Sequence, residues 1–377
     1  MTTSRPSSVL LAGGGSAGHV SPLLALADAL VRRDPDVRVT ALGTEAGLEA
    51  RLVPARGYPL RFVPKVAMPR RPTAALLRLP GSLRAAVEAA GRAIDESGAQ
   101  VVVGFGGYVS TPAYLAARRR RIPIVVHEQN STAGLANRVG ARLTRYVATT
   151  FPRTRLAHAR VLGIPLRREI ATLDRSVLRL EAMAALGLDP QWPTLLVTGG
   201  SLGAQRLNEA FSAEAGSLSG AGVQVLHVTG RGKELTVDVP GADQGGAPYV
   251  VVPYVDRMEL AYAAADLVVC RAGANTVCEL TAVGLPAVYV PLPIGNGEQR
   301  ANAEHVVAVG GGLLVDDADL TPRWVSTDLL GLATDRARIA QMATAAATVG
   351  ERGADEALAD LVQEAFAGGV AAAERAS

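Results

Sequence analysis

The stretch that decides the fold is Val9-Leu10-Leu11-Ala12-Gly13-Gly14-Gly15-Ser16-Ala17-Gly18-His19. Its first four residues form a short apolar run typical of a buried strand, and the glycines after it indicate a tight loop. An amphipathic pattern from about Ser21 to Arg33 predicts a helix behind the loop. A strand, a glycine loop and a helix in this order open a doubly wound α/β domain.

The same unit returns in the second half of the chain. After Pro193, the strand-like run 194–198 leads into Gly199-Gly200-Ser201-Leu202-Gly203-Ala204, and a helix is expected from about Gln205. Further apolar runs alternate with helical stretches at 37–42, 101–104 and 124–127, then at 223–228, 267–270, 287–290 and 312–315. Because this alternation is typical of parallel sheets, the predicted fold class is α/β, with two Rossmann-like doubly wound domains and an interdomain cleft.

The length of 377 residues also favours two domains, since one hydrophobic core seldom grows over so long a chain. We place the domains at 1–165 and 166–349, with a linker near Gly163–Arg168. A C-terminal helix is expected at about Asp355 to Ala367, within residues 350–377. The sequence leaves open which of the two domains it packs on.

Charge is divided unequally between the two halves. Residues 1–165 carry 23 Lys and Arg against 9 Asp and Glu, or +14, while residues 166–377 carry 15 against 26, or −11. This asymmetry indicates that the first domain faces an anionic surface or substrate, which leaves nucleic acid, membrane and phosphate open. Cys270 and Cys278 have no CxxC spacing, so a reducing compartment is expected, and neither a signal peptide nor a transmembrane helix is predicted.

Gly13-x-Gly15-x-x-Gly18 matches the dinucleotide-binding fingerprint, but the match is weak by itself. The second strand ends at Gly43-Thr44 without the acidic residue that binds a ribose, and the next carboxylate, Glu45, lies beyond it. A P-loop is excluded because His19 follows Gly18 in place of Lys. Two tandem domains with phosphate-binding loops instead favour a sugar-nucleotide transferase.

Three stretches resemble the MurG family of glycosyltransferases. They are 13–19 (already quoted), Gly104-Phe105-Gly106-Gly107-Tyr108 leading to His127-Glu128-Gln129-Asn130, and Arg271-Ala272-Gly273-Ala274-Asn275-Thr276-Val277-Cys278-Glu279. The resemblance also takes in Gly199–Ala204 and Pro291–Asn302, in the right order. Leu202, Ser21 and Asn275 depart from the family pattern.

The resemblance implies a GT-B hexosyltransferase of peptidoglycan synthesis, needed for cell shape and division. It would transfer GlcNAc from UDP-GlcNAc to lipid I, undecaprenyl-pyrophosphoryl-MurNAc-pentapeptide, forming the β-1,4 linkage of lipid II by an inverting, metal-independent reaction without a cofactor. Expected partners are both substrates, the anionic inner leaflet of the plasma membrane and cell-wall synthesis proteins, but not nucleic acid. The protein would lie peripherally on the cytoplasmic face of the membrane. Alternatives are a related transferase acting on a secondary-metabolite acceptor, a UDP-GlcNAc 2-epimerase and a non-catalytic nucleotide-sugar sensor.

On this resemblance the basic N-terminal domain takes the acceptor. His19 lies at the junction of loop and helix, where the helix dipole favours a neutral imidazole, as a general base requires; binding a phosphate or holding the loop is the other interpretation. Asn130 would contact the acceptor or cap a helix. The acceptor pyrophosphate would lie on two loops, whose glycines could instead serve only tight turns: Gly14, Gly15, Ser16, Ala17 and Gly18, and Gly106, Gly107 and Tyr108.

The C-terminal domain would take the donor. Glu279 would accept the ribose hydroxyls of UDP, although Thr276-x-x-Glu279 also reads as a capping box. Val255 would contact the uracil or belong to a core pair at a strand end, and Glu298 and Gln299 would read the sugar hydroxyls or lie at the surface. The donor diphosphate would meet Arg167, Ser201, Ala274, Asn275 and Thr276.

Two motifs spell the DxD of metal-dependent transferases, Asp34-Pro35-Asp36 and Asp317-Ala318-Asp319. Both are interpreted as solvated turn acids, so no metal site is expected. The segment Val66–Arg84 is predicted to dock on membrane or, alternatively, to bury Leu76, Leu77 and Leu83 in a helix face. Its apolar and basic residues are Met68, Leu76, Leu77 and Leu79, and Lys65, Arg70, Arg71, Arg78 and Arg84.

Overall fold

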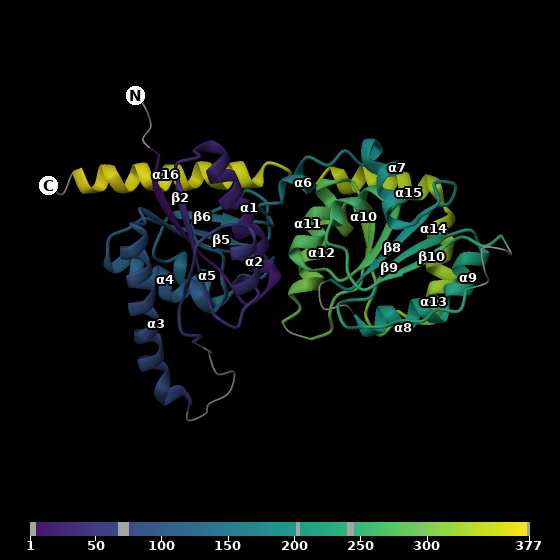
Figure 1. The fold of residues 1–377 in the computed structure, drawn as a ribbon, viewed down its shortest axis with the longest axis horizontal. Coiled ribbons are helices and arrows are strands. Elements are labelled where there is room, and N and C mark those ends of the chain that lie inside the picture. The colour runs from purple at the N-terminus through teal and green to yellow at the C-terminus, as the bar shows by residue number, and fades with distance from the viewer. Residues whose placement is uncertain (1–4, 67–74, 201–203, 240–244, 295, 375–377) are drawn as a thin grey trace. The chain divides into compact units, whose positions relative to one another are not determined.

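The computed structural model describes residues 5–66, 75–200, 204–239, 245–294 and 296–374. The chain forms two compact units (Figure 1). Unit 1 comprises Met1–Arg167 together with Arg352–Ser377, and unit 2 comprises Arg168–Glu351. Each unit is built on one parallel β-sheet.

The sheet of unit 1 has seven strands in the order β3-β2-β1-β4-β5-β6-β7. The chain steps outward from β1 to β3 and then returns to β4 on the other side of β1, so the strand order reverses between β1 and β4. Apolar residues fill the central strands because helices cover both faces. The strands are β1 (Ser8–Ala12), β2 (Arg38–Gly43), β3 (Leu60–Phe62), β4 (Val101–Gly104), β5 (Ile124–Glu128), β6 (Tyr146–Thr149) and β7 (Ala159–Val161).

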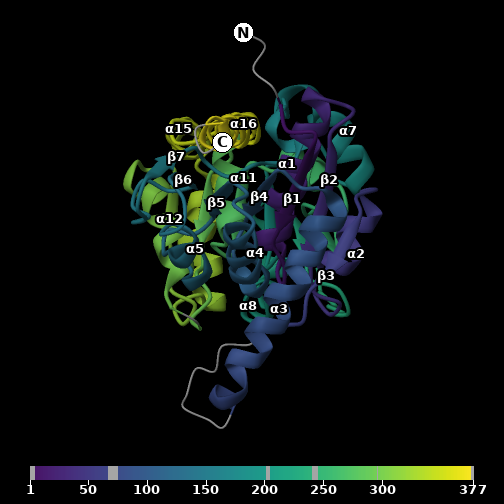
Figure 2. The same ribbon diagram turned by 90° about the vertical axis from the view of Figure 1, so that its left-hand side faces the viewer.

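The helices of unit 1 form a layer on each face of this sheet, and Figure 2 shows unit 1 in a second view. Val9 and Leu11 of β1 point to one core, with α1 (Ala17–Arg33), α2 (Glu49–Ala55) and α16 (Ala354–Glu374). Leu10 and Ala12 point to the opposite core, with α3 (Ala75–Ser97) and α4 (Gly107–Arg119). The short α5 (Leu135–Gly140) packs on α4.

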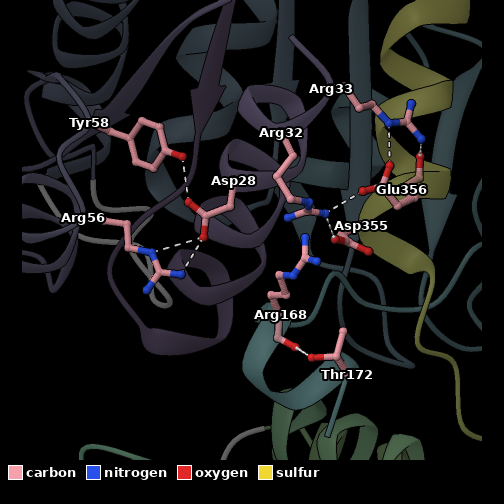
Figure 3. A network of polar contacts seen from close by, with 9 residues as sticks. All are labelled: Asp28, Arg32, Arg33, Arg56, Tyr58, Arg168, Thr172, Asp355 and Glu356. Atoms are coloured by element: carbon pink, nitrogen blue, oxygen red, sulfur yellow. Dashed lines mark hydrogen bonds and ion pairs between the residues drawn. The ribbon is translucent and has the colours of Figure 1, made fainter. Parts of the chain in front are cut away.

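Helix α16 is longer than the predicted 355–367 and packs along α1. Arg32 Nη2 lies 2.6 Å from Asp355 Oδ2, and Arg33 Nε lies 2.5 Å from Glu356 Oε2 (Figure 3). Close approach further along the helix depends on Gly368, because a Cβ there would lie 2.1 Å from the hydroxyl oxygen of Tyr146. Ion pairs and close packing thus attach the C-terminal helix to unit 1.

The sheet of unit 2 has six strands in the order β10-β9-β8-β11-β12-β13, and its order reverses between β8 and β11. The strands are β8 (Thr194–Thr198), β9 (Gln224–Val228), β10 (Tyr249–Val252), β11 (Leu267–Cys270), β12 (Ala287–Tyr289) and β13 (Gly312–Leu314). The helices are α6 (Arg168–Ala171), α7 (Arg175–Leu186), α8 (Gln205–Ala213), α9 (Ala215–Gly220), α10 (Met258–Ala264), α11 (Ala274–Ala282), α12 (Glu298–Ala308), α13 (Pro322–Trp324), the π-helix η2 (Val325–Leu329), α14 (Leu330–Thr334) and α15 (Arg336–Ala347).

The nine predicted strands are all present, whereas β3, β6, β7 and β10 were not predicted. All four have three or four residues; β3, β6 and β7 contain no run of three aliphatic residues, whereas β10 does contain one, Val250-Val251-Val252, that was not singled out. Helix α1 begins at Ala17, four residues before the expected Ser21, so His19 lies inside it. No helix in the described part of the chain is long and apolar enough to span a membrane.

Candidate functional site

The first glycine loop of unit 1 is held by a carboxylate that sequence reasoning missed. Glu49, on α2, is fully buried; its Oε2 accepts from Gly15 N at 2.8 Å and its Oε1 from Thr44 N and Oγ1, each at 2.8 Å. A Cβ at Gly14 would lie 2.3 Å from Glu49 Oε1, so this position needs glycine. Burial disfavours the ionised carboxylate, but the bonds from Gly15 and Thr44 outweigh it and lower the pKa of Glu49.

The second loop of unit 1 touches the first. Gly106 and Gly107 adopt positive φ values of 89° and 76°, and α4 starts at Gly107. Ser110 Oγ accepts from Gly106 N at 2.9 Å and donates to Ala12 O at 3.0 Å, which ties the end of β4 to the end of β1. A Cβ on Gly107 would lie 2.8 Å from Gly14 O. Both predicted phosphate loops therefore meet where the strand order reverses.

His19 joins these two loops. Its Nδ1 lies 3.2 Å from Gly14 O and 3.0 Å from Ser16 Oγ. Donation from Nδ1–H to Gly14 O leaves Nε2 as the basic nitrogen, and Nε2 lies 3.3 Å from the position of a Cβ on Gly106. Burial lowers the pKa of His19, although the Gly14 carbonyl and the charge of Glu49 act in the opposite direction. The imidazole is thus neutral near pH 7, with burial as the largest cause of the lowered pKa.

The segment after β5 is organised by Glu128, a second buried carboxylate. Its Oε1 accepts from Asn130 N at 3.0 Å, and its Oε2 accepts from Gly134 N and Asn137 Nδ2, each at 2.9 Å. Burial raises the pKa of Glu128 despite these bonds. Helix α5 begins at Leu135 with Gly134 as its N-cap, so the interpretation of Asn130 as a helix cap is wrong. Asn130 is half-buried and lies two residues after β5, the strand next to β4 in the sheet.

His127 is a structural residue. Its Nε2 donates to Gly163 O at 2.9 Å and its Nδ1 accepts from Gln129 Nε2 at 2.9 Å. Complete burial lowers the pKa of His127 to about 4. The exposed Tyr108 lies at the start of α4, with Lys65 Nζ 5.5 Å from its ring centroid, which places a cation beside the second loop.

In unit 2 the start of α11 is the corresponding place, since it follows β11 where that sheet reverses. Ala272 precedes the N-cap residue Gly273. The N–H of Ala272 donates to Gln299 Oε1 at 3.2 Å, and the carbonyl of Ala272 accepts from Asn302 Nδ2 at 3.3 Å. Helix α12 therefore positions the first amides of α11, including those of the predicted residues Ala274, Asn275 and Thr276.

Gln299 also accepts from Leu292 N at 2.9 Å through the same oxygen. Its Oε1 is therefore used within the protein, and a contact with a sugar would have to come from Nε2. Glu298 opens α12 and is half-buried. Asn302, fully buried, was not singled out from the sequence; its place on the same helix face as Gln299, three residues on, was the available signal.

Glu279 lies in the second turn of α11, and its Oε2 accepts from the hydroxyl of Tyr262 at 2.7 Å. Because Gly273 is the N-cap, Thr276 is not, and the capping-box interpretation is wrong. Val255 follows β10 and is buried, so a contact with a base would involve its backbone groups. Arg167 falls in the donor domain 166–349 drawn from the sequence, but in the structure it is the last residue of the first part of unit 1. Ser201 lies outside the described residues, as do Met68, Arg70 and Arg71 and the side chains of Leu76, Leu77 and Arg78.

The carboxylate of Asp317 is not a solvated turn acid, which corrects the sequence interpretation. Its side chain is 13% exposed and lies 2.6 Å from Arg271 Nη1, while its Oδ2 accepts from Arg206 Nε at 3.1 Å. Arg271 Nη1 also donates to Val290 O at 3.2 Å and to Pro291 O at 3.3 Å. Asp317 thereby connects α8, which follows β8, with the segments that follow β11, β12 and β13. Asp319 is exposed, and no cluster of three or more His, Cys, Asp and Glu suited to a metal occurs among the described residues.

Each unit thus presents its candidate residues at the carboxyl ends of its strands, at the reversal of strand order where open parallel sheets bind ligands. Unit 1 offers loop amides and a neutral imidazole. Unit 2 offers the amide-rich start of α11 and the carboxylate of Glu279, which suit a phosphate and a sugar diol.

Comparison with known families matches both units. Residues 9–149 match the glycosyltransferase family 28 N-terminal domain, and residues 194–360 match the glycosyltransferase family 28 C-terminal domain. A Streptomyces avermitilis protein is 57% identical over 361 residues, covering 95% of this chain and 98% of its own. A Nocardioides protein is 60% identical over 357 residues, with 94% and 97% covered. Both are named UDP-N-acetylglucosamine–N-acetylmuramyl-(pentapeptide) pyrophosphoryl-undecaprenol N-acetylglucosamine transferase.

Solved structures give the same grouping. The crystal structure of Acinetobacter baumannii MurG matches with a TM-score of 0.77 and 30% identity, covering 95% of this chain and 100% of that one. The glycotransferase of kitacinnamycin matches with a TM-score of 0.65 and 19% identity over 96% of this chain and 100% of that one, a likeness that shows the fold alone.

Proposed function

Because the chain belongs to glycosyltransferase family 28, we propose that it transfers N-acetylglucosamine from UDP-N-acetylglucosamine to lipid I, yielding lipid II and UDP. The observation that carries this function is identity of 57% and 60%, over nearly the whole chain, to transferases named for that reaction. It is a step of peptidoglycan synthesis, and the enzyme is an N-acetylglucosaminyltransferase.

The two other enzyme activities considered from the sequence are not favoured. A 2-epimerase needs no lipid acceptor, whereas these relatives are named for a pyrophosphoryl-undecaprenol acceptor. The glycotransferase of kitacinnamycin shares the fold but only 19% of the residues, which is far below the identity to the lipid I transferases.

Unit 2 is the donor-binding half of this proposal. The first amides of α11, fixed by Gln299 and Asn302 through Ala272, would bind the UDP diphosphate at a helix N-terminus. Glu279 would accept the two ribose hydroxyls, because a carboxylate offers only acceptors and a diol offers two donors. As the bond to the sugar breaks, the same amides would stabilise the charge developing on UDP without a metal ion.

Unit 1 is the acceptor-binding half. The two glycine loops would hold the acceptor pyrophosphate, and His19 Nε2 would take the proton from the attacking 4-hydroxyl. The hydroxyl oxygen forms a bond to the anomeric carbon while the bond from that carbon to the diphosphate breaks and its electron pair leaves with UDP. A single displacement of this kind inverts the α-linked donor to a β-1,4 product. A neutral imidazole positioned at the loop junction supports this role.

The test is transfer of labelled GlcNAc from UDP-GlcNAc to purified lipid I, with and without a metal chelator. We expect label in the lipid fraction and equal rates under both conditions. Label recovered only as free sugar or as an epimer would refute the transferase assignment, while a rate abolished by the chelator would refute only the metal-independent mechanism. His19→Ala serves as the inactive control.

We also place the protein at the cytoplasmic face of the membrane, with unit 1 toward the anionic leaflet. What supports this is the +14 charge of residues 1–165 together with the lipid-linked acceptor of the relatives. Basic side chains near an anionic surface each contribute about 1 kcal/mol of binding free energy, so a handful is enough for reversible association. Cell-wall synthesis proteins as partners belong to the same proposal.

A further inference from the structure

Glu279 does not stand alone on its helix. The hydroxyl of Tyr262, on the neighbouring α10, donates to Glu279 Oε2 at 2.7 Å. Tyr262 is 2% exposed, so this hydroxyl reaches Glu279 from the packed interior of unit 2. A buried tyrosine hydroxyl normally needs a partner, and here that partner is the carboxylate assigned to the ribose.

Tyr262 is itself fixed from behind by Arg175 of α7. Arg175 Nε donates to the carbonyl of Tyr262 at 3.0 Å, Nη2 donates to the Ala265 carbonyl, and Nη1 donates to Gly284 O at 3.3 Å, just beyond α11. Burial lowers the pKa of Arg175 to about 10, so it remains charged near pH 7. One guanidinium thus holds the C-terminal end of α10 and the end of the helix that carries Glu279.

Arg179 extends the same support one turn along α7. Its Nη1 donates to the Ala264 carbonyl at 2.9 Å, and its Nη2 lies 2.8 Å from Asp266 Oδ2. Cations are stabilising at the C-terminal end of a helix, where carbonyl groups lack partners within the helix. Helix α10 is therefore a rigid platform for the Tyr262 ring.

We infer that Tyr262 is a positioning residue for the donor nucleotide, acting on the ribose through Glu279. This inference rests on the proposed role of Glu279. A glutamate side chain rotates about three bonds, and a fixed hydroxyl at Oε2 selects one orientation of the carboxylate before the ligand arrives. Each carboxylate oxygen carries two lone pairs, so the tyrosine bond leaves room for a ribose hydroxyl on the same group.

The expected effect follows from preorganisation. Ordering one flexible side chain on binding costs conformational free energy, which corresponds to a loss of about 2- to 10-fold in affinity. Tyr262→Phe keeps the ring and its packing but removes the donor. It should therefore weaken UDP binding by about that factor and raise KM for UDP-GlcNAc, while kcat changes little.

Tyr249→Phe is the matched control. Tyr249 is another tyrosine of unit 2 with an internal hydroxyl bond, at 2.8 Å to Nδ1 of the buried His227. Loss of that bond should lower stability in the same way as any lost interior hydrogen bond, without reaching the nucleotide. A general loosening of unit 2 would therefore appear in both variants, and a positioning effect only in Tyr262→Phe.

The experiment measures binding of UDP and of 2′-deoxy-UDP by calorimetry to the parent, Tyr262→Phe, Tyr249→Phe, Glu279→Gln and the double variant Tyr262→Phe/Glu279→Gln. We expect the parent to prefer UDP, Tyr262→Phe to reduce that preference, Tyr249→Phe to keep it, and the double variant to match Glu279→Gln. Equal losses for both ligands in Tyr262→Phe, or no loss, would overturn the inference.

The controls also separate this inference from the proposals beneath it. If Glu279→Gln keeps the full preference for UDP, the ribose assignment fails and the inference fails with it. The transferase function is judged independently, by label entering lipid I.

Discussion

At the residue scale, the side chain of His19 contacts both glycine loops of unit 1. Through Nδ1 it binds the carbonyl of Gly14 in the first loop, and its Nε2 faces Gly106 in the second. Burial keeps it neutral. Two features favour glycine at position 106. Its φ is +89°, and a Cβ there would lie only 3.3 Å from Nε2 of His19.

His19→Ala should lower kcat by about 10²–10⁴-fold, the usual contribution of a general base. In the parent, the pKa of His19 lies below its ordinary 6.5, so kcat should hold through neutral pH and fall only on acidification below that value. Steady-state kinetics from about pH 5 to 8 measures both effects, with the pH range chosen around the ordinary histidine pKa. A variant that keeps most of the parent's kcat would show that His19 only holds the loop.

Glu49→Gln should lower the free energy of unfolding of unit 1 by about 1–3 kcal/mol at pH 7. The carboxylate accepts from Gly15 with one oxygen and from Thr44 with the other, whereas an amide has only one acceptor oxygen. The pKa of Glu49 is lower in the folded chain than its usual 4.5. Its contribution is therefore complete above that value and is lost as the pH falls through the lowered pKa.

Urea denaturation at neutral and acidic pH checks this, with Glu45→Gln as the control because Glu45 is exposed on the same connection. The gap between parent and Glu49→Gln should close in acid. A gap that widens in acid, or an equal loss in Glu45→Gln, would contradict the role given to Glu49.

At the scale of elements, the proposed binding groups lie at the starts of α1, α4 and α11 and in the loops around them. Polar side chains hold these segments, among them Glu49, Ser110 and Gln299. Asp317 is the clearest case in unit 2, because Arg206 and Arg271 reach it from segments that follow two different strands. The motif Asp317-Ala318-Asp319 looks like a metal site in sequence but serves here as an ion-pair centre.

Asp317→Asn should destabilise unit 2 by about 3 kcal/mol, because it leaves the guanidinium of Arg271, 12% exposed, without its counter-charge. The start of α11 would loosen as a result, so KM for UDP-GlcNAc should rise. Thermal unfolding and donor kinetics measure the two effects. Asp319→Asn, at the exposed acid of the same motif, is the control and should behave like the parent. If Mg²⁺ or Mn²⁺ restored the stability and the KM of Asp317→Asn, that result would instead indicate a metal site.

Local signals predicted the elements well and their ends less well. The runs beginning at Val9 and Thr194 gave both glycine-loop openings because periodicity and glycine act over neighbouring residues. The capping box at Thr276 was wrong because α11 starts earlier, at Ala274 with Gly273 as its N-cap, just after Ala272, which Gln299 of α12 holds. Glu49 and the ion pairs of Asp317 join residues far apart in sequence, and no local pattern reveals such contacts.

At the scale of the whole molecule, the chain divides its charge unequally between its two halves. The C-terminal helix α16 returns to unit 1 and is bound there by Arg32, Arg33 and Arg160. Unit 1 therefore combines both ends of the chain with the strongly basic half of the sequence.

Membrane docking belongs to this scale. Replacing Arg70, Arg71 and Arg78 with Ser should weaken flotation with anionic vesicles, and added salt should weaken flotation of the parent, because the attraction is screened. Neutral vesicles provide the control. Equal flotation of parent and triple variant at physiological salt would show that the protein docks through another surface.

The central claim is that unit 2 alone recognises the donor nucleotide while unit 1 serves the acceptor. The most direct measurement is titration calorimetry of UDP, without acceptor, into the parent, Glu279→Gln and His19→Ala. We predict that Glu279→Gln loses UDP affinity by at least about tenfold, as expected when hydrogen bonds to a charged group are lost, and that His19→Ala binds UDP like the parent. Unchanged UDP affinity in Glu279→Gln, or a comparable loss in His19→Ala, would contradict the division of labour between the two units.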